Sequence, residues 1–460
     1  MSLRLRSSLV ALCATIVLGV LAGPAAAAPV LGVNLSGVPN DTQVAEAIAT
    51  GAKDARMFVL WRDIEPRAKG TLDTYAVGVY AGIVKRLAAA GIHTTLVVTQ
   101  SPQWASGVTN PNTPPRSLPD FADFIGRFAA SDGLKGQGIA YEIWNEEDAQ
   151  EWWGPAPDPA AYASLFKGAA SALRTADPTA KVILGPLTGN DYGFVAKLYD
   201  NGIKGTFDAA SVHTDTGCLL NGPSVVYRED GRIGRYSFLG YREVHKTMLD
   251  NSDDKPIWIS EFGWSSSQSD TEHPQCQRGA SANIKPSGVT EADQATFLTQ
   301  AYHCASADPY LQLMDWFTAR DASAAEAFNF DELEHYGLLR TNSTKKPSWS
   351  AFNTLATSGD PLTAPCGDFA GPSIKILTPQ VGESYSDKLL IRAQASDPGG
   401  IGRITFQADG KQIRNFTAEN DKPVEIEWTG ARDLNIGPHT IQVIALDKQG
   451  NQQQAEVQVR

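Results

Sequence analysis

The chain has 460 residues, of which 42% are hydrophobic and 20% charged, and its formal net charge is −12 at pH 7. This is an ordinary globular composition, and the length exceeds that of one typical domain, so we expect two. An acidic surface repels phosphate backbones and therefore argues against nucleic acid as a partner, whereas it excludes no neutral ligand.

Residues 1–28 have the features of a secretory signal peptide. Arg4 and Arg6 precede an apolar stretch over residues 9–21, and the small residues 25–28 supply an A-x-A-like cleavage site. The alternative is an uncleaved membrane anchor, but the apolar stretch is short for a bilayer span. No later stretch is long and apolar enough to span. We therefore expect a secreted, extracellular monomer with no membrane span after cleavage.

Four cysteines remain after residue 28, namely Cys218, Cys276, Cys304 and Cys366. An even number in an exported chain predicts two disulfides, with three possible pairings. We favour Cys218–Cys276, which would join loops after adjacent strands, and Cys304–Cys366, which would tie a helix to the segment that leaves the first domain. The alternative is four free buried thiols. The chain has no C-x-x-C pair, which argues against a zinc cluster.

Residues 29–367 alternate short apolar runs with helical patterns, which is typical of parallel strands joined by helices. The runs cover residues 30–35, 55–61, 93–100, 138–146, 181–186, 207–214, 256–264 and 311–318. Eight such units predict an α/β fold, a (β/α)8 TIM barrel with loop insertions. The alternative, an open doubly wound sheet, usually has a G-x-G-x-x-G loop after its first strand, and GVNLSGVPN does not match that motif.

Residues 371–460 show only short alternating runs, broken by the turn sequences DPGG, ADG and KQGN. This pattern predicts a C-terminal all-β sandwich of the Ig-like type, with ADGK and KQGN as hairpin turns. The segment contains one tryptophan, Trp428. Because sugar-binding surfaces usually need several aromatic rings, we expect a structural or attachment role for this domain.

Two glutamates end predicted barrel strands. Trp144-Asn145-Glu146 closes the fourth run, and Glu261 lies in the Ser-Glu-Phe-Gly-Trp motif of the seventh. Active sites of TIM barrels form at the C-terminal ends of the strands, and a buried glutamate needs a task or a partner. Two facing carboxyl groups are what glycosidic bond cleavage requires, one protonated to assist the leaving oxygen and one ionised to attack the anomeric carbon.

These two motifs resemble those of the retaining (β/α)8-barrel glycosidases of the 4/7 superfamily (clan A). The resemblance covers the barrel segment, including the closing stretch 335–352, and is shared about equally by xylosidase/iduronidase-like families and cellulase-like families. It implies that Glu146 is the acid/base and Glu261 the nucleophile. It also implies substrate-binding or supporting roles for Arg56 beside the nucleophile, Asn145 at the substrate 2-hydroxyl, His213 near the nucleophile and Trp316 at the floor of the sugar subsite.

Other interpretations stay open for several of these residues. Members of the superfamily often have a tyrosine soon after the strand-six histidine, but Thr214 and Asp215 stand there. Arg56 and His213 could be structural, and Glu142 and Glu147 are expected to be solvent-exposed or structural. Strand parity allows Glu142 a place inside the barrel. Among the loop tryptophans, Trp104, Trp152 and Trp153 could stack on sugar rings or serve ordinary packing.

The leading hypothesis is a secreted retaining glycoside hydrolase that acts on an extracellular poly- or oligosaccharide, with a β linkage implied by the resemblance. Glu261 would form a glycosyl-enzyme, and Glu146 would serve first as acid and then as base, with no metal or organic cofactor. The alternative is a non-catalytic carbohydrate-binding or cell-wall-associated protein on the same barrel. The presence of both glutamates favours the enzyme, and a transglycosylase would use the same residues.

Overall fold

The computed structural model describes residues 28–214, 222–226, 228–229, 231–267, 288–323, 335–360, 366–367, 371–433, 437–448 and 451–460. Residues 1–27 of the expected signal peptide and the expected pair Cys218–Cys276 lie outside these ranges. Among the residues described, no helix is both long and apolar enough to cross a membrane.

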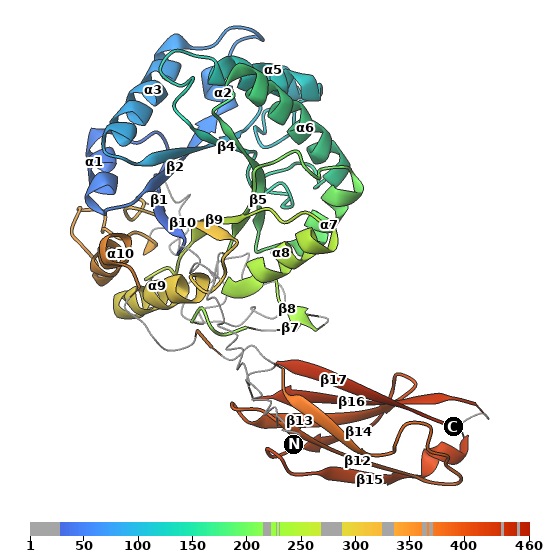
Figure 1. The fold of residues 1–460 in the computed structure, drawn as a ribbon. Coiled ribbons are helices and arrows are strands. Elements are labelled where there is room, and N and C mark those ends of the chain that lie inside the picture. Colours follow the sequence, from blue (N-terminus) through green and yellow to red (C-terminus); the bar gives the residue numbers. More distant parts are fainter. Residues whose placement is uncertain are drawn as a thin grey trace, which may run out of the picture.

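Eight parallel strands close into a barrel in the order β1-β10-β9-β6-β5-β4-β3-β2, as Figure 1 shows. The predicted (β/α)8 fold is therefore confirmed. The strands are β1 (Val30–Asn34), β2 (Asp54–Leu60), β3 (His93–Thr99), β4 (Ala140–Ile143), β5 (Lys181–Thr188), β6 (Ala209–His213), β9 (Ile257–Phe262) and β10 (Leu311–Trp316).

Helices surround the barrel because each has an apolar face. They are α1 (Asp41–Ala49), α3 (Thr74–Ala89), α5 (Leu118–Ala129), α6 (Pro159–Ala176), α7 (Tyr192–Asp200), α8 (Tyr241–Asp250), α9 (Glu291–Ala305) and α10 (Pro347–Ser358). In α5, Phe121, Phe124, Ile125 and Phe128 recur at helical spacing and are buried. The Asp158 side chain caps α6 by accepting from two backbone N–H groups.

The barrel interior changes from apolar to polar along its axis. An apolar layer of Ala140, Ile183, Ala209, Trp258 and Leu313 occupies one level. Two residues further along four of these strands stand the buried residues Glu142, Ser211, Ser260 and Asp315. Residues two apart share a face of a strand, so this second, polar layer lies one step closer to the C-terminal mouth.

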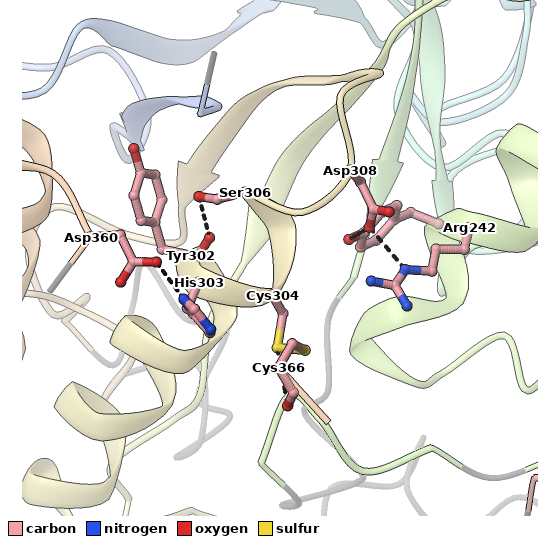
Figure 2. Close-up of a disulfide and its surroundings, with 9 residues drawn as sticks. Arg242, Tyr302, His303, Cys304, Ser306, Asp308, Asp360 and Cys366 are labelled. Atoms are coloured by element: carbon pink, nitrogen blue, oxygen red, sulfur yellow. Dashed lines mark hydrogen bonds and ion pairs between the residues drawn. A yellow bond between two sulfur atoms is a disulfide. The ribbon is translucent and has the colours of Figure 1, made fainter. Parts of the chain in front are cut away.

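A disulfide joins Cys304 at the end of α9 to Cys366 in the segment that follows α10, as predicted, and the two Cα atoms lie 4.7 Å apart (Figure 2). Nearby, His303 pairs with Asp360 and Arg242 Nε donates to Asp308 at 2.8 Å. The bond closes a loop with a sequence separation of 62 residues. By the chain-entropy relation, a loop of this size contributes about 4 kcal/mol of stability.

The C-terminal segment forms two antiparallel sheets, as expected for an Ig-like sandwich. One contains β11 (Ser373–Thr378), β12 (Leu389–Ser396) and β15 (Val424–Trp428). The other contains β14 (Lys411–Thr417), β13 (Ile401–Ala408), β16 (His439–Asp447) and β17 (Gln452–Val459). The predicted hairpin turn is present between β13 and β14, where Asp409 and Gly410 both have positive φ, 48° and 76°.

The sandwich contacts a loop at the barrel mouth. A two-stranded ribbon, β7 (Arg228–Glu229) and β8 (Arg232–Ile233), lies between β6 and α8 and faces the sandwich in Figure 1. Arg228 Nη2 donates to Asn451 Oδ1 at 2.5 Å.

Candidate active site

Three strands bring acidic and imidazole groups together at the C-terminal mouth of the barrel. One side-chain ligand atom from each of Glu146, His213 and Glu261 lies within 4.8 Å of the others. Glu146 follows β4, His213 ends β6 and Glu261 is in β9. The side chains of Glu146 and Glu261 are 21% and 14% exposed, so a ligand can reach both, although their surroundings are largely protein.

Glu146 lies on an unusual backbone turn. Its φ is 47° and that of Trp144 is 75°, values that non-glycine residues rarely adopt. The N–H of Glu146 donates to the Pro186 carbonyl of β5 at 3.0 Å, and the Trp144 side chain is fully buried. Such a conformation persists only where the surroundings hold it, and it is common in functional sites.

A β-bulge in β9 allows Glu261 to face the interior. On the neighbouring β6, Val212 pairs with Ile259 and His213 pairs with Glu261, so Ser260 is an extra residue in β9. The Ser260 hydroxyl nevertheless faces the interior, where its oxygen lies 2.6 Å from Ser211 Oγ. In a regular strand Ser260 and Glu261 would point to opposite faces; the bulge removes that alternation.

Arg56 connects the nucleophile candidate to the interior of the barrel. It is fully buried; Nε donates to Glu142 Oε2 at 2.7 Å and Nη1 to Asn34 Oδ1 at 2.8 Å. Nη1 also donates to Glu261 Oε1, and Nη2 to Asn145 Oδ1 at 3.2 Å. The predicted contact between Arg56 and Glu261 is therefore present, and Asn145 joins the same cluster.

Glu142 and Asn34 belong to the site although the sequence assigned neither a role in it. Glu142 Oε1 accepts from Ser211 Oγ at 2.6 Å, and Asn34 Nδ2 donates to the Ser260 carbonyl at 2.8 Å. Strand parity allowed Glu142 a place in the interior, where the structure has it fully buried, and Asn34 is a polar residue near the end of the first apolar run. These signals mark inward-facing positions, but they do not identify Arg56 as the shared partner.

His213 bridges the two glutamates. Its Nδ1 is 2.8 Å from Glu146 Oε1, and its Nε2 is 3.4 Å from Glu261 Oε1 and 3.3 Å from Arg56 Nη2. An arginine can only donate, so its approach favours an Nε2 that accepts. The proton of a neutral His213 then lies on Nδ1 and is donated to Glu146.

The two glutamates have different electrostatic surroundings. Burial raises the pKa of Glu146 to about 7, while Arg56 and a hydrogen bond from Trp152 oppose the rise. Burial also raises the pKa of Glu261, but there Arg56, in direct contact, opposes the rise, as does His213 when it is protonated. This arrangement favours a protonated Glu146 beside an ionised Glu261, which is the division of labour that an acid and a nucleophile need.

Of the tryptophans expected at the site, Trp152 is the one that reaches Glu146. It is half-buried, its side chain opposes the rise in the pKa of Glu146, and its ring stacks on Phe58 with ring centroids 5.9 Å apart. Phe58 is half-buried and lies two residues after Arg56 on β2, a position that sequence reasoning missed. The two stacked rings form an aromatic surface next to Arg56, whose guanidinium carbon lies 5.3 Å from the centroid of the Phe58 ring.

Trp104 and Trp316 are used for packing. Trp104 Nε1 donates to the Glu65 carbonyl at 2.8 Å, and its ring packs edge-on against Trp61. Trp316 is fully buried, and its Nε1 donates to the Tyr336 carbonyl at 2.9 Å. Trp316 exposes no ring face, so its expected role as the floor of a sugar subsite receives no support from the structure.

The cluster of Glu146, His213 and Glu261 has the donor atoms that a divalent cation could use. However, Arg56 already donates to the Glu261 oxygen that faces His213. A cation there would compete with a guanidinium that is fully buried and always charged. The geometry thus favours acid–base catalysis by the side chains themselves. That the enzyme needs no cofactor stays a prediction.

Comparison with known proteins points to one enzyme family. A family model described as "Glycosyl hydrolases family 39" matches residues 121–382, and one described as "Bacterial Ig domain" matches residues 372–443. No curated protein matches the chain.

Similar solved structures include a family 39 glycoside hydrolase from the gut symbiont Bacteroides cellulosilyticus WH2. It has a TM-score of 0.55 and 16% identity, over 87% of this chain and 79% of that one. A GH39 β-xylosidase from Caulobacter crescentus has a TM-score of 0.51 and 16% identity, over 83% and 84% of the two chains. A GH39 enzyme from Xanthomonas axonopodis pv. citri has a TM-score of 0.52 and 14% identity, over 88% and 93%. At these identities the likeness concerns the fold.

Proposed function

Because the chain belongs to glycosyl hydrolase family 39, we propose that this glycoside hydrolase cleaves a β-linked oligo- or polysaccharide with retention of anomeric configuration. Glu261 is the nucleophile and Glu146 the acid/base. The observation that carries the proposal is the geometry of the pair, in which oxygens of Glu146 and Glu261 lie within 4.8 Å and Arg56 contacts Glu261.

The separation of the carboxyl groups supports a double displacement. Retaining enzymes place the two groups about 5–5.5 Å apart, whereas inverting enzymes need about 6.5–9.5 Å to admit a water molecule. One oxygen of Glu146 lies within 4.8 Å of one oxygen of Glu261, which fits the shorter separation better than the longer one.

In the first step, ionised Glu261 attacks the anomeric carbon and the glycosidic C–O bond breaks. Glu146 donates its proton to the departing oxygen, which leaves as an alcohol. Arg56 keeps Glu261 ionised and oriented. In the second step, ionised Glu146 takes a proton from water, whose oxygen attacks the same carbon and releases Glu261. Two inversions give retention.

The neighbouring polar groups support both steps. Asn145 Oδ1 accepts from Arg56, which leaves its Nδ2 as the group that can donate to a sugar hydroxyl. The Nδ1–H of His213 donates to Glu146 and can favour its ionised form in the second step. Trp152 and Phe58 offer ring surface beside the reacting sugar.

Secretion is part of the proposal. The signal peptide features of residues 1–28 support it, as does the Cys304–Cys366 disulfide, because such bonds persist in oxidising compartments. The sandwich would then act outside the cell as a structural or attachment module.

The test is the configuration of the first product. A panel of aryl β-glycosides is digested and followed by proton NMR during the first minutes, before the free sugar equilibrates. We expect the β anomer to appear first, followed by slow mutarotation, with the pure sugar as a control for that rate. A first-formed α anomer would overturn the retaining mechanism, and an inert enzyme across the panel and across polysaccharides would favour a binding protein.

A further inference from the structure

Arg235, in the loop between β8 and α8, joins three of the loops that form the mouth of the barrel. Its Nη1 donates to Asp191 Oδ2 at 2.6 Å, at the start of α7. Its Nη2 donates to Asp148 Oδ2 at 3.1 Å and to the Thr188 carbonyl at 2.6 Å. The Arg235 side chain is 26% exposed and that of Asp148 is fully buried, so these bonds are largely shielded from water.

The segment that Arg235 contacts begins at Glu146. The Glu146 N–H donates to the Pro186 carbonyl at 3.0 Å, and two residues later Asp148 Oδ1 accepts from the Thr188 N–H at 2.8 Å. Residues 146–148 are thereby attached to the end of β5 at two points. Arg235 bonds to both sides of this junction, because it reaches Asp148 and Thr188 with the same nitrogen.

The junction between residues 146–148 and the end of β5 needs a third contact beyond these two attachments. Glu146 has a φ of 47°, which costs energy for a residue with a side chain, so neighbouring bonds must maintain it. Asp148 is a buried carboxyl group whose pKa burial raises to about 7, while the Thr188 N–H and Arg235 oppose the rise. Without the Arg235 guanidinium, an ionised Asp148 would have no cationic partner, and the junction would lose a charged hydrogen bond.

We propose that Arg235 is a positioning residue for the acid/base: by bonding Asp148 and the end of β5, it holds the strained turn that aims Glu146 at the leaving oxygen. The inference rests on the proposed function, since it presumes that Glu146 donates the proton. General acid catalysis depends on the reach between the donor and the departing oxygen, so a displaced Glu146 transfers its proton less effectively.

The role predicts a loss that depends on the leaving group. An activated aryl glycoside departs with little proton assistance, whereas a sugar or alkyl leaving group needs it. For Arg235→Gln we expect kcat/KM to fall about tenfold to hundredfold on a substrate with a poor leaving group, a fraction of the full effect of a general acid. On a dinitrophenyl glycoside of the same sugar we expect a change of about threefold or less.

Two further variants keep the test decisive if Arg235→Gln folds poorly. Arg235→Lys keeps the charge but cannot reach three acceptors as a planar fork does, so we expect an intermediate loss with the same selectivity. Asp148→Asn keeps the shape of the side chain and removes its charge, and should show the same dependence on the leaving group. Thermal unfolding of each variant reports its folded fraction.

Arg242→Gln is the matched control. Arg242 is 23% exposed and pairs with the partly buried Asp308, but it lies on α8 and our proposal gives it no part in positioning Glu146. We expect both substrates to respond alike and by about twofold at most. Equal losses on both substrates for Arg235→Gln, or no loss on either, would overturn the positioning role. If instead the wild-type enzyme gave no hydrolysis or an inverted product, the proposed function itself would fail, so the two failures are distinguishable.

Discussion

The barrel interior and the sandwich surface place their carboxyl groups in opposite surroundings. In the barrel, burial raises the pKa values of Asp54, Glu146 and Asp148 to about 7. In the sandwich, the backbone N–H of Thr440 and the His439 side chain lower the pKa of Asp409, and a hydrogen bond from Lys422 lowers that of Glu419. Near neutral pH these three carboxyl groups of the barrel are therefore still partly protonated, whereas Asp409 and Glu419 of the sandwich are ionised.

The difference follows from how each domain is built. The core of the sandwich comes from strands that alternate apolar and polar residues, and ion pairs such as Lys388–Glu427 stay on its surface, with side chains 58% and 65% exposed. The barrel instead buries Arg56 among several acids. Burying a charged group is costly unless the group is paired. The buried charged groups at one end of the barrel therefore mark the place where a catalytic site is expected.

The largest effect should come from Glu261→Gln. The amide can still accept from Arg56, so the fold should persist, but it cannot attack the anomeric carbon. We expect kcat/KM on an activated aryl glycoside to fall by several orders of magnitude. Circular dichroism provides the folding control. Residual activity near that of the wild type would show that the nucleophile is another residue.

A smaller effect, on stability, should separate a buried ion pair from an exposed one. Glu142→Ala leaves the buried Arg56 without its 2.7 Å partner, and loss of one member of a buried pair costs about 3–5 kcal/mol. The matched variant in the sandwich is Glu425→Ala, whose partner Arg392 lies 3.3 Å away with both side chains about half exposed. Its cost should be below about 1 kcal/mol.

Denaturant unfolding measures this contrast if tryptophan fluorescence follows the barrel, because nine of the ten tryptophans precede the sandwich, and far-UV circular dichroism follows the sandwich strands as well. Glu142→Ala should lower the midpoint of the barrel transition clearly. Similar small shifts for Glu142→Ala and Glu425→Ala would contradict the view that the barrel depends on its buried charge.

The sequence predicted the architecture well because periodicity is a local property. The run over residues 93–100, for example, corresponds to β3, His93–Thr99, and the ADGK turn links β13 to β14. The pairing of Cys304 with Cys366 was also predicted, from the place of each cysteine relative to a helix and a domain end. Such signals depend on neighbours along the chain, which the sequence displays directly.

The contacts inside the site could not be predicted in the same way. Arg56, Glu142 and Asn34 come from three strands, and their meeting depends on the closure and register of the barrel. The β9 bulge that turns Glu261 inward has no sequence signal, and neither has the burial of Trp316. Arg235 lies in a loop without periodicity. The roles assigned to these residues stay predictions until the variants are measured.

The smallest effect we predict is a pH dependence of hydrolysis, which a carboxyl group of the barrel should cause and the sandwich should not. Burial raises the pKa of Glu146 to about 7, so this group is protonated below that pH and ionised above it. An ionised Glu146 cannot donate a proton to the leaving oxygen. Hydrolysis of a substrate with a poor leaving group should therefore fall as the pH rises above about 7, approaching tenfold per pH unit.

Glu146→Ala isolates the group responsible for this decline. On a dinitrophenyl glycoside, which needs no proton to depart, the variant should carry out the glycosylation step at a rate near that of the wild type and without the loss above pH 7. Single-turnover kinetics separate that step from the hydrolysis of the intermediate, which Glu146→Ala should slow and a small nucleophile such as azide should restore. If the alkaline decline survives in Glu146→Ala, another group titrates there. Because Asp148 is the neighbouring barrel acid whose pKa burial also raises to about 7, the same profile recorded with Asp148→Asn would then identify or exclude it.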